Sequence, residues 1–272
     1  MQHHFSLHKI FEEQSFTFCA TAYSKFKFGD GQISAQFGTA LAEGFINEVL
    51  EKEKPTQQIV VLSSPYSFIP TATFAMKNYF VYELNKWLVQ NNLPIVQQTK
   101  IHRTITYKED YGELDAAERI KLIGNDSFHI DKLFLENKVL FFLDDIKITG
   151  GHERMINKMI ENYGITNNRY FLYFAELINA DIHPKIENYL NYYAVKSIFD
   201  LVPIIQKSNF EINTRLVKYV LNANTEDFKK FLGNVDINFI HLLYNMAIGN
   251  GYYAIEKYKE NVGFINQIIT VS

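Results

Sequence analysis

The chain has 272 residues, of which 47% are hydrophobic and 21% are charged, and this composition indicates a folded globular protein rather than a disordered one. Its 27 basic and 30 acidic residues leave a net charge of -3, so we expect neither nucleic acid nor a membrane as a partner. Cys19 is the only cysteine, which excludes an internal disulfide and a thiolate zinc cluster.

The N-terminal stretch carries no sign of a targeting segment. Residues 1–16 mix His, Lys, Glu and Gln and lack the apolar region of a signal peptide. Since no apolar run elsewhere has the length of a membrane span, we expect a cytoplasmic protein. His3, His4 and His8 are candidate metal ligands, but we expect them in a flexible terminus and assign no metal ligands.

The first half of the chain alternates strand-like and helix-like segments, which predicts an α/β fold with a parallel sheet and crossover helices. Residues 59–62 form a short β-branched run, and a helix follows over about 71–89. Residues 94–101 can form the next strand. Residues 103–115 are polar and charged, so we expect an excursion from the packed fold there.

The clearest strand covers residues 139–143, because five successive apolar residues require burial on both faces of a sheet. We expect it to stop at Asp144. A helix is predicted from Glu153 onward and a further strand over 169–177. Beyond about residue 180 the pattern is helical throughout, which predicts a helical domain over 181–272 after a first domain over 1–180.

The turn after the clearest strand carries the chemistry. Asp144 and Asp145 leave its carboxyl end, and Thr149, Gly150 and Gly151 lead from them into a helix. Such a turn directs backbone N–H groups and the positive helix end at a phosphate. The alternative is an ordinary strand-to-helix turn with a solvated acidic pair. The occurrence of the acidic pair and the small-residue turn in one strand-to-helix connection favours phosphate binding.

Residues 139–152 resemble the motif with which type I phosphoribosyltransferases bind 5-phosphoribosyl-1-pyrophosphate (PRPP). The resemblance implies a phosphoribosyltransferase fold and Mg²⁺ bound largely by the substrate. It also implies that Asp144 and Asp145 hold the ribose hydroxyls, with Asp145 catalytic. The loop that would cradle the 5-phosphate consists of Ile148, Thr149, Gly150, Gly151 and His152. Lys147 stands where an apolar residue is usual, and His152 where Ser or Thr is usual.

Two further segments are similar to parts of orotate phosphoribosyltransferases. Residues 65–73 resemble their pyrophosphate loop, which makes Tyr66 and Ser67 implied substrate contacts, although Ser67 and Phe68 stand where Lys and Gly are expected. Residues 25–34 resemble their N-terminal hood, expected here over about 1–55, and imply that Phe28 stacks on a base. A plain surface loop and an ordinary core phenylalanine are the alternatives.

Residues 108–113 resemble the catalytic mobile loop of the same enzymes, with Lys108 and Asp110 as implied catalytic residues. Lys100, Arg103 and Lys108 would bring positive charge to the departing pyrophosphate. A solvated charged loop is the alternative, about equally well supported.

The leading hypothesis is a magnesium-dependent transferase that moves phosphoribosyl from PRPP to an orotate-like base and releases pyrophosphate. The resemblance also implies a homodimer. Two alternatives remain: a non-catalytic PRPP or nucleotide sensor, and a specialised transferase of a stress-related biosynthetic cluster.

Overall fold

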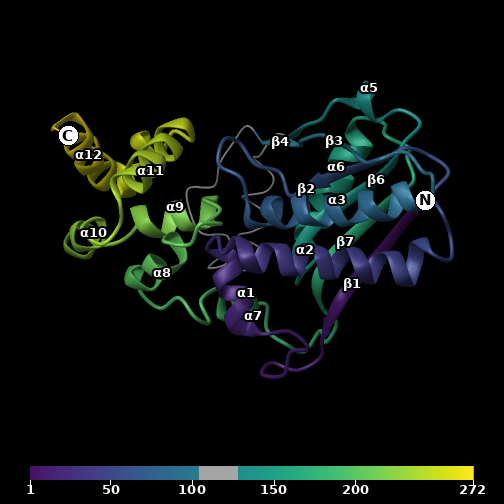
Figure 1. Cartoon of the computed structure of the whole chain (residues 1–272), viewed down its shortest axis with the longest axis horizontal. Coiled ribbons are helices and arrows are strands. Elements are labelled where there is room, and N and C mark those ends of the chain that lie inside the picture. Colours follow the sequence, from purple (N-terminus) through teal and green to yellow (C-terminus); the bar gives the residue numbers. More distant parts are fainter. Residues whose placement is uncertain (104–127, 272) are drawn as a thin grey trace.

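A five-stranded parallel sheet forms the centre of the protein, whose computed structural model describes residues 1–103 and 128–271 (Figure 1). The strand order is β1-β7-β6-β2-β3, and each neighbouring pair is parallel. The strands are β1 (Gln2–Ile10), β2 (Ile59–Ser63), β3 (Gln97–Gln98), β6 (Val139–Lys147) and β7 (Arg169–Leu177). The predicted α/β fold with a parallel sheet is therefore confirmed.

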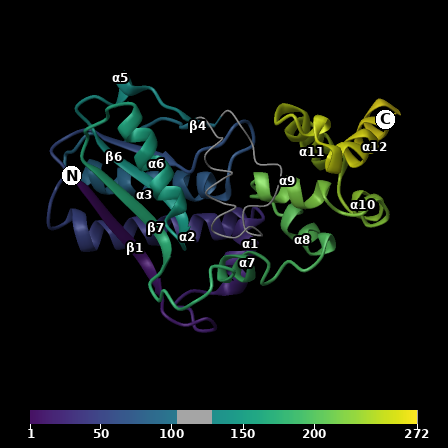
Figure 2. The same ribbon diagram turned by 180° about the vertical axis from the view of Figure 1, so that it is seen from behind.

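The apolar run of β6 is buried on both faces, as its sequence predicts. Phe141 and Leu143 join the hydrophobic cluster beneath α2 (Gly31–Phe45) and α3 (Ala72–Gln90). Leu140 and Phe142 join the cluster beneath α6 (Gly151–Asn162) on the opposite face. The reverse view shows α6 across the sheet from α2 and α3 (Figure 2).

The prediction that β6 ends at Asp144 is wrong, because the strand continues to Lys147 with Asp144 opposite Tyr173 and Lys147 opposite Glu176. Side chains of neighbouring elements hydrogen-bond both aspartates, so these residues stay in the sheet. α6 begins at Gly151, before the expected Glu153, and residues 94–101 form only the short β3. The remaining short elements here are α1 (Ala20–Lys27), a π-helical turn (Ile46–Leu50), β4 (His102–Arg103), β5 (Phe128–His129) and α5 (Lys132–Leu135).

The N-terminus is an edge strand, so the expectation of a flexible terminus is wrong. β1 pairs with β7 from Gln2 to Ile10, and this ladder fixes all three N-terminal histidines. The rings of His3 and Tyr170 stack with their centroids 4.7 Å apart, and His8 packs edge-on against Phe174. Residues 2–10 thus lie in the main sheet, not in a separate hood.

The C-terminal part is helical, as predicted, and has its own hydrophobic cluster. The cluster draws on residues from Val195 to Ile265 and also includes Phe28 and Ile69; residues 195–271 are called the helical segment below. Its helices are α8 (Val202–Ile205), α9 (Thr214–Leu221), α10 (Thr225–Leu232), α11 (Ile237–Gly249) and α12 (Glu256–Val271), with 3-10 turns at Ile198–Leu201 and Tyr252–Ala254.

The preceding helix α7 (Ile186–Asn191) packs with the sheet instead, since Ile186 and Leu190 belong to the cluster beneath α2. A domain boundary between residues 180 and 181 stays a prediction. Within residues 1–103 and 128–271, no helix combines the length and the apolar character needed to cross a membrane.

Lys77 of α3 is a buried cation in this fold. Its residue is 4% exposed, and its Nζ donates to Gln98 Oε1 at 2.7 Å and lies 4.3 Å from the centre of the Phe74 ring. Burial lowers the pKa of Lys77 from 10.5 to about 8. The fold therefore disfavours the charged amine.

We expect Lys77→Met to stabilise the protein at pH 7 by roughly 1–3 kcal/mol, because the charged amine is penalised only in the folded state. With a pKa of about 8 folded against 10.5 unfolded, the penalty is complete below pH 8 and fades as the pH rises to 10.5. Urea unfolding at pH 7, 9 and 10.5 measures the stability difference. Lys86→Met, at an exposed position of the same helix, is the control, and a gain at Lys77 that is equal at all three pH values would contradict the prediction.

Candidate functional site

A cavity of about 250 Å³ opens where β2 and β6 end. Such a crevice at the carboxyl ends of parallel strands is the usual place for a ligand in an α/β protein. Elements far apart in the sequence build its walls: Lys27 of α1, Ser64 after β2, Thr73 of α3, the end of β6 with the following loop, and Thr214, Arg215 and Lys218 of α9.

Asp144 faces this cavity in a network of donors. Its Oδ1 accepts from Ser64 Oγ at 2.8 Å, and its Oδ2 lies 2.6 Å from His152 Nδ1. Burial by itself would raise the pKa of Asp144, but the charge and hydrogen bond of His152, the hydrogen bond of Ser64 and the charge of Lys27 outweigh it. They hold the pKa of this carboxyl well below its usual range, so Asp144 stays ionised.

Asp145 is held more tightly and is only 5% exposed. Lys27 Nζ forms an ion pair with its Oδ2, and Tyr23 OH donates to the same oxygen. Thr73 Oγ1 lies 3.1 Å from Asp145 Oδ1 and 3.3 Å from Asp144 Oδ1, which links the two carboxylates. Burial and the neighbouring Asp145 raise the pKa of the Tyr23 hydroxyl, so Tyr23 remains a donor to Asp145.

The loop between β6 and α6 has the geometry of an anion cradle. Gly150 is the N-cap of α6 at φ 68°, in the left-handed region that favours glycine. The first-turn N–H groups that follow lack intrahelical acceptors, and residues 148–152 all line the cavity. Arg154 braces the loop by donating from Nη1 to the Thr149 carbonyl at 2.7 Å.

Lys147 and Glu153 flank this loop in a second network. Lys147 Nζ lies 3.1 Å from both Glu153 Oε2 and Glu176 Oε1, and His4 Nε2 lies 2.6 Å from Glu153 Oε1. Burial would raise the pKa of Glu153, but hydrogen bonds from His4, Tyr173 and Lys147 lower it overall. Lys147, which departs from the motif, therefore neutralises carboxylates at the cavity wall.

The structure brings most of the candidate residues of the motif together. The cavity is lined by Arg103, Asp144, Asp145, Ile148, Thr149, Gly150, Gly151 and His152. Tyr66, Ser67 and Lys100 are neighbours outside its lining: Lys100 Nζ donates to the Ser67 carbonyl at 2.5 Å and lies 3.9 Å from the centre of the Tyr66 ring. The candidates Lys108 and Asp110, and the rest of the segment 108–113 that resembles a mobile loop, lie outside the described residues.

Phe28 does not line this cavity, and its implied role in stacking on a base is corrected here. Its side chain is fully buried, and its ring lies 5.7 Å from that of Tyr192 and 5.2 Å from that of Tyr219, measured between centroids. α1 turns Phe28 toward the core of the helical segment, because that core buries a large apolar ring that the polar cavity would leave in water.

Several residues of the site carry no local signal in the sequence. Tyr23 and Lys27 meet Asp145 across 122 and 118 residues of chain, and Thr73 meets it across 72. Arg215 and Lys218 reach the cavity from the helical segment. No motif marks these positions, since only the packing of α1, α3 and α9 around β6 brings them together.

A family model described as ComF-like phosphoribosyltransferase matches residues 1–265. No curated protein sequence matches the chain. Among solved structures, a hypoxanthine phosphoribosyltransferase from Staphylococcus aureus shares 10% identity over 54% of this chain and 75% of its own, with a TM-score of 0.33. One from Trypanosoma cruzi shares 14% identity over 56% and 78%, with a TM-score of 0.34.

Proposed function

The chain belongs to the ComF-like phosphoribosyltransferase family, and on that premise we propose that it transfers the phosphoribosyl group of PRPP to a nitrogenous, orotate-like base and releases pyrophosphate. One observation carries the proposal: an ionised carboxylate and a glycine-containing anion loop line the same cavity. The 5-phosphate would bind at residues 148–152, and Asp144 would accept hydrogen bonds from the ribose hydroxyls.

Magnesium fits this site as an ion carried mainly by the substrate. Among the described residues, no three His, Cys, Asp or Glu side chains gather as a metal cluster, and both carboxylates of the pair already accept hydrogen bonds. Mg²⁺ usually keeps several waters and binds substrate phosphates with one or two carboxylates, here Asp144 and Asp145. When bound, it would neutralise charge on the diphosphate.

The residues of the cavity suit an electrostatic mechanism. Asp144 keeps its negative charge beside the ribose, where it would stabilise positive charge that develops as the bond from C1 to the diphosphate breaks. Thr73 and Ser64 hold its carboxylate in one orientation. No covalent nucleophile is required. Asp145 would act on the ribose only after its contact with Lys27 is altered.

Titration calorimetry with PRPP and Mg²⁺ tests the binding part of this proposal. We expect Asp144→Asn to weaken PRPP binding roughly tenfold or more, because hydrogen bonds to a charged group contribute about 1.5–3 kcal/mol. Glu161→Gln, at an exposed position near the other end of α6, should bind like the wild type. If Asp144→Asn also binds PRPP like the wild type, the acidic pair is not part of the site.

Pyrophosphate release with a panel of purine and pyrimidine bases, orotate included, tests catalysis. Base-dependent release by the wild type supports the transferase. A second candidate is a non-catalytic PRPP or nucleotide sensor, favoured by the Lys27 ion pair that occupies Asp145. Tight PRPP binding without release for any base would support the sensor. The cytoplasmic location, the homodimer, the domain division and the specialised biosynthetic role remain predictions.

A further inference from the structure

The diphosphate of PRPP needs positive charge that residues 64–71, beside the cavity, do not contain. This loop has no lysine or arginine. Lys27 and Lys147 line the cavity in ion pairs: Lys27 pairs with Asp145, and Lys147 pairs with Glu153 and Glu176. Since a diphosphate is strongly anionic, further cations must reach the same cavity if PRPP binds there.

The loop over residues 64–71 is fastened to the helical segment. Thr214, the first residue of α9, donates from Oγ1 to the Ile69 carbonyl at 2.8 Å and from its backbone N–H to the Pro70 carbonyl at 2.9 Å. The side chain of Asn250 accepts from the backbone N–H groups of Phe68 and Ile69 at 3.2 and 3.4 Å. These two amides are therefore already bonded to Asn250 and are not available to a diphosphate.

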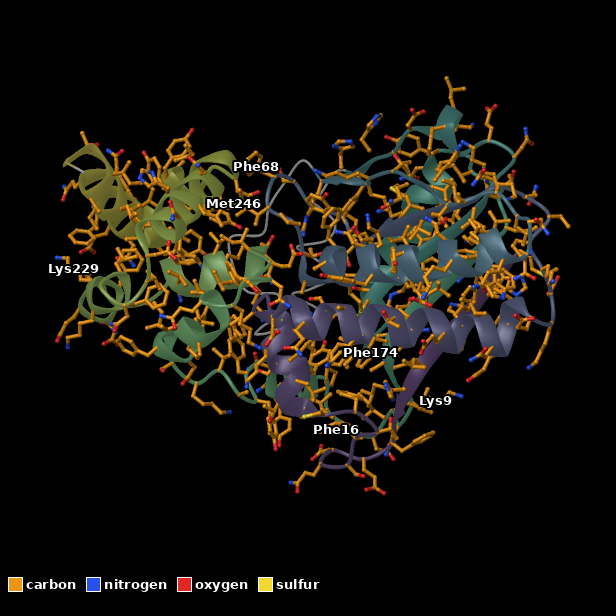
Figure 3. The ribbon with its side chains drawn as sticks, in the orientation of Figure 1. Lys9, Phe16, Phe68, Phe174, Lys229 and Met246 are labelled. Carbon is orange, nitrogen blue, oxygen red and sulfur yellow. The ribbon has the colours of Figure 1, made fainter. Side chains whose placement is uncertain are left out.

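Phe68 adds an apolar contact to this attachment. Its ring lies against Gly249 at the end of α11, where an added Cβ would come within 2.3 Å of Phe68 Cε1. Figure 3 shows Phe68 between the two parts of the molecule, close to Met246 of α11. The loop and the helical segment thus form one wall, and α9 is its part nearest α1 and α2 in both ribbon views (Figures 1 and 2).

α9 carries two cations into the cavity from this wall. Arg215 and Lys218 are three residues apart on the helix, so they project from the same face, and both are half-buried where they line the cavity. Arg215 also lies against Tyr192, with its guanidinium carbon 5.7 Å from the ring centre. A guanidinium and an amine on one rigid face match the charge and spread of a diphosphate.

We infer that Arg215 and Lys218 bind the diphosphate of PRPP, so that the helical segment supplies one wall of the substrate site. The inference rests on the proposed function and assigns a role to the part of the chain that lies outside the sheet. The alternative is that Arg215 and Lys218 bind an anionic group of the acceptor base in place of the diphosphate.

Titration calorimetry with Mg²⁺ separates these possibilities when PRPP is compared with ribose 5-phosphate, which lacks the diphosphate. We expect the double variant Arg215→Gln, Lys218→Gln to bind PRPP at least roughly tenfold more weakly than the wild type, because two charge-assisted contacts are lost. Its affinity for ribose 5-phosphate should stay within about twofold. Lys230→Gln, at an exposed position of α10, is the matched control and should bind both ligands like the wild type.

The charge-conserving variants Arg215→Lys and Lys218→Arg should retain most of the PRPP affinity, which keeps the test valid if the double variant unfolds. Three outcomes for the double variant would overturn the inference. The first is an unchanged affinity for PRPP, and the second is an equal loss of affinity for PRPP and ribose 5-phosphate. The third is a loss of affinity for the anionic base orotate alone, with the affinities for uracil and PRPP unchanged. The proposed function fails separately, and the inference with it, if the wild type binds neither PRPP nor ribose 5-phosphate.

Discussion

Replacing Asp145 by asparagine is expected to destabilise the protein by about 3–5 kcal/mol, because it leaves the buried Lys27 amine without its counter-ion. Both partners are nearly buried, with 11% of the Lys27 side chain and 7% of the Asp145 side chain exposed. Asparagine preserves the shape and can still contact Thr73 and Tyr23, so the lost charge is the main change. Urea unfolding of the variant and the wild type at pH 7 measures the difference.

The double variant Lys27→Met, Asp145→Asn is the control for this prediction. Removing both charges relieves the uncompensated cation, so most of the lost stability should return. Because we expect this double variant to stay folded, its PRPP affinity tests whether Lys27 and Asp145 together contribute to binding. Wild-type stability in the single Asp145→Asn variant would mean that the ion pair does not stabilise the fold.

Phe28→Ala is expected to destabilise the protein by about 3–5 kcal/mol, as truncation of a fully buried phenylalanine does elsewhere. The cavity would open between α1 and the tyrosines Tyr192 and Tyr219, where the helical segment meets the sheet part. Because Phe28 does not line the ligand cavity, the PRPP affinity of the folded variant should stay within about twofold of the wild type. Urea unfolding and calorimetry below the melting transition provide the two measurements.

Phe11→Ala is the matched control for Phe28, because Phe11 is 56% exposed and the loss of its ring should change stability by less than about 0.5 kcal/mol. A Phe28→Ala variant that keeps its stability but binds a base or PRPP much more weakly would restore the stacking role that the sequence alone implies.

The centre of the fold could be predicted from the sequence because its signals are local. Five successive apolar residues define β6, and the small residues from Thr149 to Gly151 define the turn into α6. The end of β6 could not be predicted, because its aspartates stay in the sheet through partners from α1, α3 and α6. The edge strand β1 was missed since its alternation is carried partly by histidines that stack on β7.

In the candidate site, too, the local part could be predicted from the sequence and the long-range contacts could not. The proposed phosphate loop lies within one segment of the chain and could be identified there from the sequence. The environment of Asp145 depends on Lys27 and Tyr23, more than a hundred residues earlier. The implied contact of Phe28 with a base was wrong, because an aromatic residue beside a lysine suits a hydrophobic core as well as a ligand site.

The hydrophobic core of the helical segment is completed from outside it, by Phe28 and Ile69. Neither part of the molecule is therefore a self-contained module. A protein cut before Val195 would expose both side chains to water, and the isolated helical segment would have a gap where they belong. Fusions, domain exchanges and minimal versions of this chain must therefore keep α1, residues 64–71 and the helical segment together.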